Sequence, residues 1–162
     1  MTEYFRQLNE IEYQKLRDAI PLITVLIAGA DGTIDNSEIS WAEKVIEIRG
    51  YKMSEDLIEF YQEVGKDFDS KLSNFINGFS GDINSRTEQI SSKLEELNPI
   101  LAKLDPKVGA HLYKSYVSFA EHVAKSTGGF FGFFSVGAEE KGLMKLNMIN
   151  PILFAEDSTE EE

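Results

Sequence analysis

The sequence contains no cysteine, and its 162 residues include only two histidines and one tryptophan. The absence of cysteine excludes disulfides, zinc–thiolate sites, iron–sulfur clusters and thiol catalysis. The two histidines, His111 and His122, are too few for a histidine-rich metal site. Their spacing along a helix would put about three turns between them, which is too far apart for a shared metal ion. We therefore expect both to be ordinary helix residues.

Basic residues are also scarce. The chain has 16 lysines and arginines against 28 aspartates and glutamates, which leaves a net charge of −12. Such a charge repels phosphate backbones, and no part of the sequence concentrates enough basic residues to overcome that repulsion. The composition therefore predicts no nucleic-acid binding and makes direct contact with an anionic membrane unfavourable. It favours cations or basic protein surfaces as partners.

Long apolar runs are missing as well. The first 18 residues lack the apolar region of a signal peptide. The longest apolar stretch, residues 20–30, is interrupted by a proline, a threonine and a glycine and is too short to cross a bilayer. On these grounds we expect a soluble cytoplasmic protein.

Helical periodicity dominates the sequence, and no segment alternates convincingly as a strand would. The length is that of one domain. The pattern predicts an all-α fold, a compact bundle of six to seven helices over residues 1–154, followed by a disordered acidic tail at 155–162. The expected helical segments are 4–17, 22–30, 36–49, 54–79, 84–104, 106–126 and 138–149, with Gly65 able to bend or divide the fourth of them.

The most informative stretch is the turn between the second and third expected segments. Asp31, Asp35 and Glu38 place three carboxylates within eight residues. Asp31 would lie at the C-terminal end of a helix, where a negative charge is disfavoured by about 0.3–1 kcal/mol. Like charges are costly to bring together unless a cation or a basic side chain neutralises them. With Thr33 and backbone carbonyls, the turn offers oxygen ligands for Ca²⁺ or Mg²⁺.

The spacing of this turn also matches the second half of a calcium-binding loop. Gly32 would occupy the position of the invariant glycine, and Glu38 the position of the bidentate glutamate. The first and third positions would be Ile27 and Gly29, whose side chains supply no oxygen. The loop is thus incomplete, and we expect any cation to be held weakly.

A purely structural explanation of the turn remains open. Gly32 could supply the left-handed conformation that ends a helix. Asp35 is a good N-cap residue, and Glu38 three residues later completes an arrangement like a capping box. By this interpretation the segment is a well-capped helical hairpin without a ligand.

The segment AGADGTIDNSE, residues 28–38, resembles the mark of the TerB family of tellurite-resistance-associated helical domains. The resemblance implies a metal-binding or scaffold domain linked to stress response, and no established catalyst. The family also implies a second, pseudo-symmetric copy of the helix–turn–helix. Residues 119–128 echo the first copy weakly, with Thr127 in place of the aspartate, and Glu139 and Glu140 could contribute from the helix that follows.

A phenylalanine-rich segment follows the second copy. Its four phenylalanines are Phe130, Phe131, Phe133 and Phe134. They predict either a buried plug at one end of the bundle or a loop that docks on a protein partner, because large exposed apolar patches usually mark binding surfaces.

The sequence holds no glycine-rich phosphate loop with its lysine and no hydrolase nucleophile elbow. We therefore expect a non-enzymatic binding module with a divalent cation at the Asp31–Glu38 turn. The alternative is a metal-free interaction module that uses its acidic face or the Phe130–Phe134 segment. The protein partner and the oligomeric state are not determined by the sequence.

Overall fold

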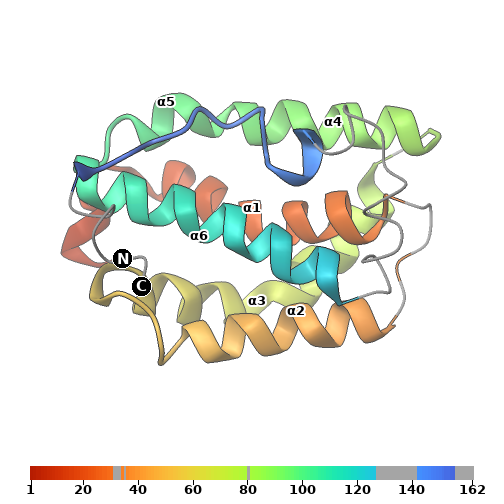
Figure 1. The fold of residues 1–162 in the computed structure, drawn as a ribbon, viewed down its shortest axis with the longest axis horizontal. Helices are drawn as coiled ribbons and strands as arrows, with labels where there is room; N and C mark the ends of the chain where they lie inside the picture. The colour runs from red at the N-terminus through yellow and green to blue at the C-terminus, as the bar shows by residue number, and fades with distance from the viewer. Residues whose placement is uncertain (31–33, 35, 80, 127–141, 156–162) are drawn as a thin grey trace.

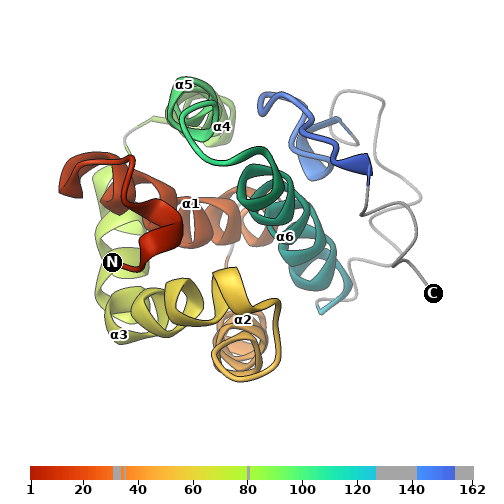
Figure 2. The ribbon, with the colours of Figure 1, turned by 90° about the vertical axis from the view of Figure 1, so that its left-hand side faces the viewer.

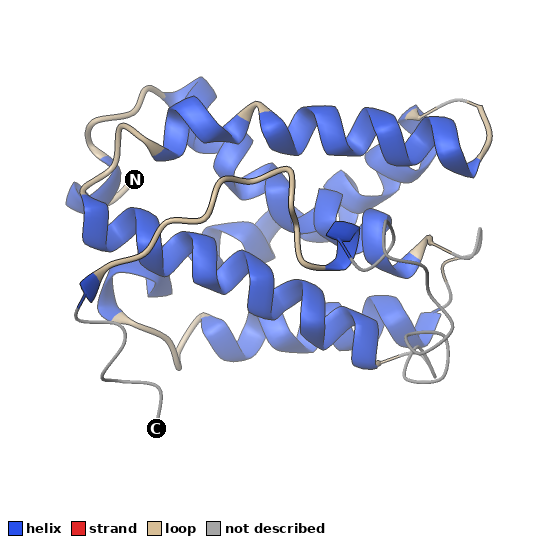
Figure 3. Cartoon of the chain, turned by 45° about the horizontal axis from the view of Figure 1, so that its top comes forward, coloured by secondary structure: helices blue, strands red, loops and turns tan. Residues whose placement is uncertain are grey.

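The structure, a computed structural model, describes residues 1–30, 34, 36–79, 81–126 and 142–155. Over these residues the chain is helical with connecting loops and has no strand (Figure 3), which confirms the all-α prediction. No helix in the described part is long and apolar enough to span a membrane. The elements are η1 (Glu3–Phe5), α1 (Glu10–Ala28), α2 (Asn36–Arg49), α3 (Glu55–Gly78), α4 (Ile83–Glu95), α5 (Leu97–Leu101) and α6 (Pro106–Lys125), shown in Figure 1.

Helix α1 lies at the centre of the bundle. Viewed from the end, it is surrounded by α3, α2, α6 and the α4–α5 pair (Figure 2), and it contacts all five. Every residue from Ala19 to Ala28 is buried. A helix that is apolar on all sides belongs in the interior, so the apolar run at 20–30 forms the core of the fold.

The predicted segments 4–17 and 22–30 correspond in the structure to the single helix α1, which contains Pro21 and begins at Glu10, six residues later than predicted and after the short η1. Proline removes one backbone hydrogen bond from a helix interior, but contacts around Pro21 support the helix there. The Tyr116 hydroxyl donates to the Leu16 carbonyl at 2.7 Å, and the Thr24 hydroxyl donates to the Ile20 carbonyl at 2.9 Å. Burial on all sides holds the helix together across the proline. The helix ends at Ala28, two residues earlier than predicted.

Helices α2, α3 and α6 meet around one buried arginine. Helix α2 has the predicted bounds, and Gly65 does not divide α3. Arg49, at the end of α2, is only 7% exposed. Its guanidinium donates to the Tyr61 hydroxyl at 2.9 Å, to the Ser115 carbonyl at 2.8 Å and to the Ser118 hydroxyl at 2.7 Å. One side chain thus links three helices.

The predicted segment 84–104 is divided at Glu96 into α4 and the short α5. The start of α6, by contrast, is as predicted. Pro106 is in its first turn, and the Asp105 carboxylate accepts from the Lys107 backbone amide at 3.0 Å. An N-cap aspartate followed by proline is a strong local signal for a helix start.

The predicted helix at 138–149 is wrong in its described part. Only residues 142–144 are helical, and a turn follows. Leu146 is fully buried with φ at 54°, a left-handed conformation that breaks a right-handed helix. Asn98 holds the segment in place, because its side chain donates to the Met148 carbonyl at 3.0 Å and accepts from the Asn150 amide at 2.8 Å. Most of the predicted tail, residues 156–162, lies outside the described residues.

Candidate functional site

The structure describes the predicted cation site only in part. Asp31, Thr33 and Asp35 lie outside the described residues. Glu38 lies in the first turn of α2, where a carboxylate suits the helix dipole, and it is only 4% exposed. A carboxylate removed from water needs a compensating charge or hydrogen bonds. Glu38 is therefore a buried acid at the start of the helix that follows the turn.

A basic side chain reaches the other side of this turn. Arg86, on α4, donates to the carbonyl oxygen of Gly29 at 2.6 Å, just after the last residue of α1. A cation at a helix C-terminus is favourable because it compensates the helix dipole. Gly29 makes this approach possible, since a Cβ there would lie 2.6 Å from Nη2 of Arg86 and 2.5 Å from the Val25 carbonyl. The sequence predicted that a cation or a basic side chain would neutralise this turn, but nothing in it identified Arg86.

The remaining predicted site residues cannot be placed. Glu139, Glu140 and the four phenylalanines of the Phe130–Phe134 segment all lie outside the described residues, as do Thr127 and the end of the second helix–turn–helix copy. Within the ranges that the structure does describe, no three histidine, aspartate or glutamate side chains come together in a way that could hold a metal ion.

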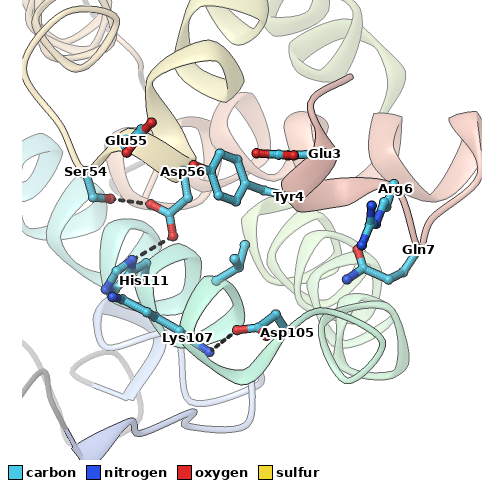
Figure 4. A pocket seen from close by; sticks show the side chains of 11 residues that line it. Glu3, Tyr4, Arg6, Gln7, Ser54, Glu55, Asp56, Asp105, Lys107 and His111 are labelled. Carbon is cyan, nitrogen blue, oxygen red and sulfur yellow. Dashed lines mark hydrogen bonds and ion pairs between the residues drawn. The ribbon is translucent and has the colours of Figure 1, made fainter.

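A second feature, which the sequence analysis did not single out, is a pocket of about 560 Å³ (Figure 4). It lies where η1 meets the N-terminal ends of α3 and α6. Asp56, from the first turn of α3, is 7% exposed and lies between two partners. The Ser54 hydroxyl donates to its Oδ1 at 2.6 Å, and Nδ1 of His111, from α6, is 2.7 Å from its Oδ2. The buried carboxylate thus joins α3 to α6.

The order of these groups decides what chemistry they support. In a hydrolase triad the histidine contacts the serine hydroxyl and the carboxylate lies behind the histidine. Here the carboxylate of Asp56 is in the middle, so the Ser54 hydroxyl donates its hydrogen bond to Asp56 and not to His111. Desolvation, followed by the charges of Glu55 and Glu3, raises the pKa of Tyr4 beside them. The pocket wall therefore holds a hydrogen-bonded structural pair beside a protonated phenol.

Asp56 and His111 are 55 residues apart, so no local pattern could have paired them. The available signal was weak. Both residues lie near the beginning of an expected helix, and adjacent helix starts can meet at one end of a bundle. Pairing them requires the packing of α3 against α6, which the periodicity of either helix alone does not define.

Replacing Asp56 by alanine is expected to destabilise the fold by about 1.5–3 kcal/mol, because two hydrogen bonds to a buried charged group are lost. Glu55→Ala is the matched control, since it removes an exposed carboxylate from the same turn of α3 and should cost about 0.3–1 kcal/mol through the dipole. Urea denaturation of both variants measures the difference. Equal losses would show that the Asp56–His111 contact adds nothing beyond the helix-end charge.

Comparison with known proteins adds no relative. No family model, no curated protein and no solved structure matches the chain. The case for its function therefore rests on the residues and contacts described above.

Proposed function

We propose that the chain is a non-enzymatic, TerB-like binding domain in the cytoplasm, and that the turn between α1 and α2 holds a divalent cation. Its role would lie in stress response or in the assembly of a complex with a protein partner. The observation that carries the proposal is the burial of Glu38, a carboxylate 4% exposed at the start of α2 and three residues after Asp35.

Counting the charges at the turn supports a divalent ion. Asp31, Asp35 and Glu38 bring three negative charges within eight residues, and Arg86 brings one positive charge to the end of α1. The balance of −2 is what Ca²⁺ or Mg²⁺ neutralises. Both ions take oxygen ligands, which carboxylates, the Thr33 hydroxyl and backbone carbonyls supply.

The same residues predict weak binding. The third position of the matching calcium loop is Gly29, which has no side-chain oxygen, and its carbonyl already accepts a hydrogen bond from Arg86. The first position is Ile27, which is buried at 8% exposure. With fewer ligands than a complete loop, the turn should bind calcium in the range of the weaker sites, about 10⁻⁴–10⁻³ M.

Thermal unfolding of the metal-stripped protein, with and without millimolar Ca²⁺ or Mg²⁺, tests the proposal. An ion that binds only the folded state raises its stability, by about 2.7 kcal/mol at a hundredfold excess over the dissociation constant and by less at weaker saturation. Asp31→Ala should abolish this rise, whereas Asp67→Ala on α3 should retain it. If neither ion changes the transition, the turn is a capped hairpin, and Asp31→Ala should then be neutral or stabilising.

A further inference from the structure

Helices α2 and α3 form a groove of about 420 Å³ on the face that their packing leaves open. It shares no lining residue with the Asp56–His111 pocket. Its floor is apolar and buried, since Ile46 and Phe68 are each 3% exposed and Tyr61 is fully buried. The groove thus presents an apolar base of the kind that ligand-binding clefts share.

Gly65, in the middle of α3, keeps this groove open. A Cβ at this position would lie 3.5 Å from Cγ2 of Ile46, which is an ordinary van der Waals contact. Packing between the helices therefore does not require glycine here. In a helix interior glycine is less stable than alanine by about 0.5–1 kcal/mol. The missing side chain thus leaves space at a cost in helix stability.

The rim of the groove is acidic. Glu43 and Glu47 come from α2 and Asp69 comes from α3, and no lysine or arginine lines the groove among the described residues. The side chains of Glu43 and Asp69 lie within hydrogen-bonding reach of one another from opposite helices. That contact, followed by desolvation and the charge of Asp69, raises the pKa of Glu43. Two carboxyl groups therefore face each other across the groove, close enough to repel when both are ionised.

An aromatic ring stands at one end of the same groove. Tyr51 follows α2 and is 68% exposed, although it is large and apolar over most of its surface. Exposed tyrosines of this kind are enriched at interfaces, because the ring contributes apolar contact and its hydroxyl a hydrogen bond. A cation placed over such a ring gains a further favourable electrostatic contact.

We propose that the α2–α3 groove binds a lysine or arginine side chain on a basic segment of a partner protein. The alkyl stem lies on Ile46 and Phe68, and the cationic group lies between the carboxylates of the rim. A second copy of this chain is a poor occupant, because each copy carries a charge of −12. The exposed ring of Tyr51, which also lines the groove, can contact the partner residues next to the bound lysine or arginine. This inference is independent of the proposed cation site at the α1–α2 turn.

A peptide-binding experiment on the full chain tests the groove. The probe is a short synthetic peptide with two lysines among alanines, and its acetyl-lysine version keeps the length but lacks the charge. Titration of ¹⁵N-labelled protein should shift the amide signals of Gly50 and Gly65, which line the groove. The double variant Glu43→Gln/Asp69→Asn should weaken binding about tenfold or more. It should also melt at a higher temperature than the unaltered protein, because the repulsion across the groove is removed.

Three further variants sharpen the test. Gly65→Leu fills the groove without changing its charge and should abolish binding, and Gly65→Ala should bind less tightly while unfolding at a higher temperature. Glu88→Gln removes one charge from exposed α4, on the far side of the bundle (Figure 2), and should bind as the unaltered protein does.

Four results would overturn the proposal. The first is equal weakening by Glu88→Gln, which would mean that the peptide responds only to net charge. The second is equal affinity for the acetyl-lysine peptide. The third is that spermidine binds more tightly than the peptide with the same dependence on Glu43 and Asp69, which would assign the groove to a small free amine. Loss of signals elsewhere, with Gly50 and Gly65 unmoved, would also place the binding outside the groove.

Discussion

The Arg49→Ala variant is expected to lose about 3 kcal/mol or more of its free energy of unfolding. The change removes the three hydrogen bonds through which α2 is tied to α3 and α6. It also removes a buried side chain whose guanidinium lies 5.2 Å from the centre of the Tyr61 ring and 5.8 Å from that of Phe119. Large-to-small changes at buried positions typically cost 2–5 kcal/mol. Chemical denaturation monitored by circular dichroism measures the loss.

A methionine at this position separates packing from charge. Among the described residues Arg49 makes no ion pair with a carboxylate, so its charge is held by neutral oxygens and by ring faces. A methionine keeps much of the packing, and the oxygens that it leaves behind keep other partners, because the Tyr61 hydroxyl donates to the Ser115 hydroxyl and the Ser118 hydroxyl donates to the Ser115 carbonyl. Arg49→Met should therefore lose less than half of what Arg49→Ala loses. Equal losses in the two variants would show that the hydrogen bonds dominate over packing.

The pKa of His122 reports locally on the loss of the Arg49 charge. Desolvation, followed by the charges of Arg49 and Lys125, lowers the pKa of His122. Removing the Arg49 charge should move that pKa upward, toward its ordinary value, in an NMR titration of Arg49→Met. An unchanged pKa would contradict the placement of the guanidinium beside α6.

The Phe60→Ala variant should lose about 3–5 kcal/mol, the usual range for a buried phenylalanine. Phe60 is fully buried, and its ring centre is 5.6 Å from that of Phe5, 6.1 Å from that of Tyr13 and 5.3 Å from that of Tyr61. The ring therefore joins the N-terminal η1, helix α1 and helix α3. Its loss leaves a cavity among aromatic side chains that cannot close without moving three elements.

Phe75→Ala is the matched control for Phe60→Ala. Phe75 is on the same helix and stacks on Phe79 with ring centres 6.1 Å apart, but it is only partly buried. Phe75→Ala removes less buried apolar surface than Phe60→Ala does, and it should lower the free energy of unfolding by about 1 kcal/mol. Urea denaturation of both variants, with unchanged m-values, supplies the comparison. If the two losses are equal, the packing around Phe60 is not the tight core that the structure describes.

The sequence predicted those parts of the fold that local signals determine. Gly50 ends α2 at its predicted residue, and the pair Asp105–Pro106 begins α6 at its predicted residue. Caps and breakers act on the residues beside them, so their effect is visible in a short window of sequence. The helical periodicity of the apolar residues likewise identified the all-α class.

The errors occur where a distant contact decides the local conformation. The sequence predicted separate segments at 4–17 and 22–30, but one helix, α1, passes through Pro21, supported by the five helices around it and by the Tyr116 hydroxyl. The segment before Asn150 predicted a helix, but the side chain of Asn98 and the burial of Leu146 hold it as a turn. In both cases the deciding partner is about 50 or more residues away.

The candidate sites divide in the same way. Glu38 was found because its charge lies in a dense local pattern of carboxylates. The partners Asp56 and His111, and the facing carboxylates Glu43 and Asp69, come from different helices and carry no common motif. The sequence could predict that some basic side chain neutralises the turn. It could not predict that this residue is Arg86, because nothing in α4 indicates that Arg86 reaches the end of α1.

The central position of α1 also determines how the protein opens. Its residues 22–28 are all buried in a bundle in which five other helices contact α1, so solvent reaches their backbone amides only when covering helices separate. Amides of this kind exchange their hydrogens through global unfolding, whereas those of a surface helix such as α4 exchange through local openings. We therefore expect the last part of α1 to exchange more slowly than α4. A variant that destabilises one of the helices covering α1 should therefore speed up amide hydrogen exchange at residues 22–28.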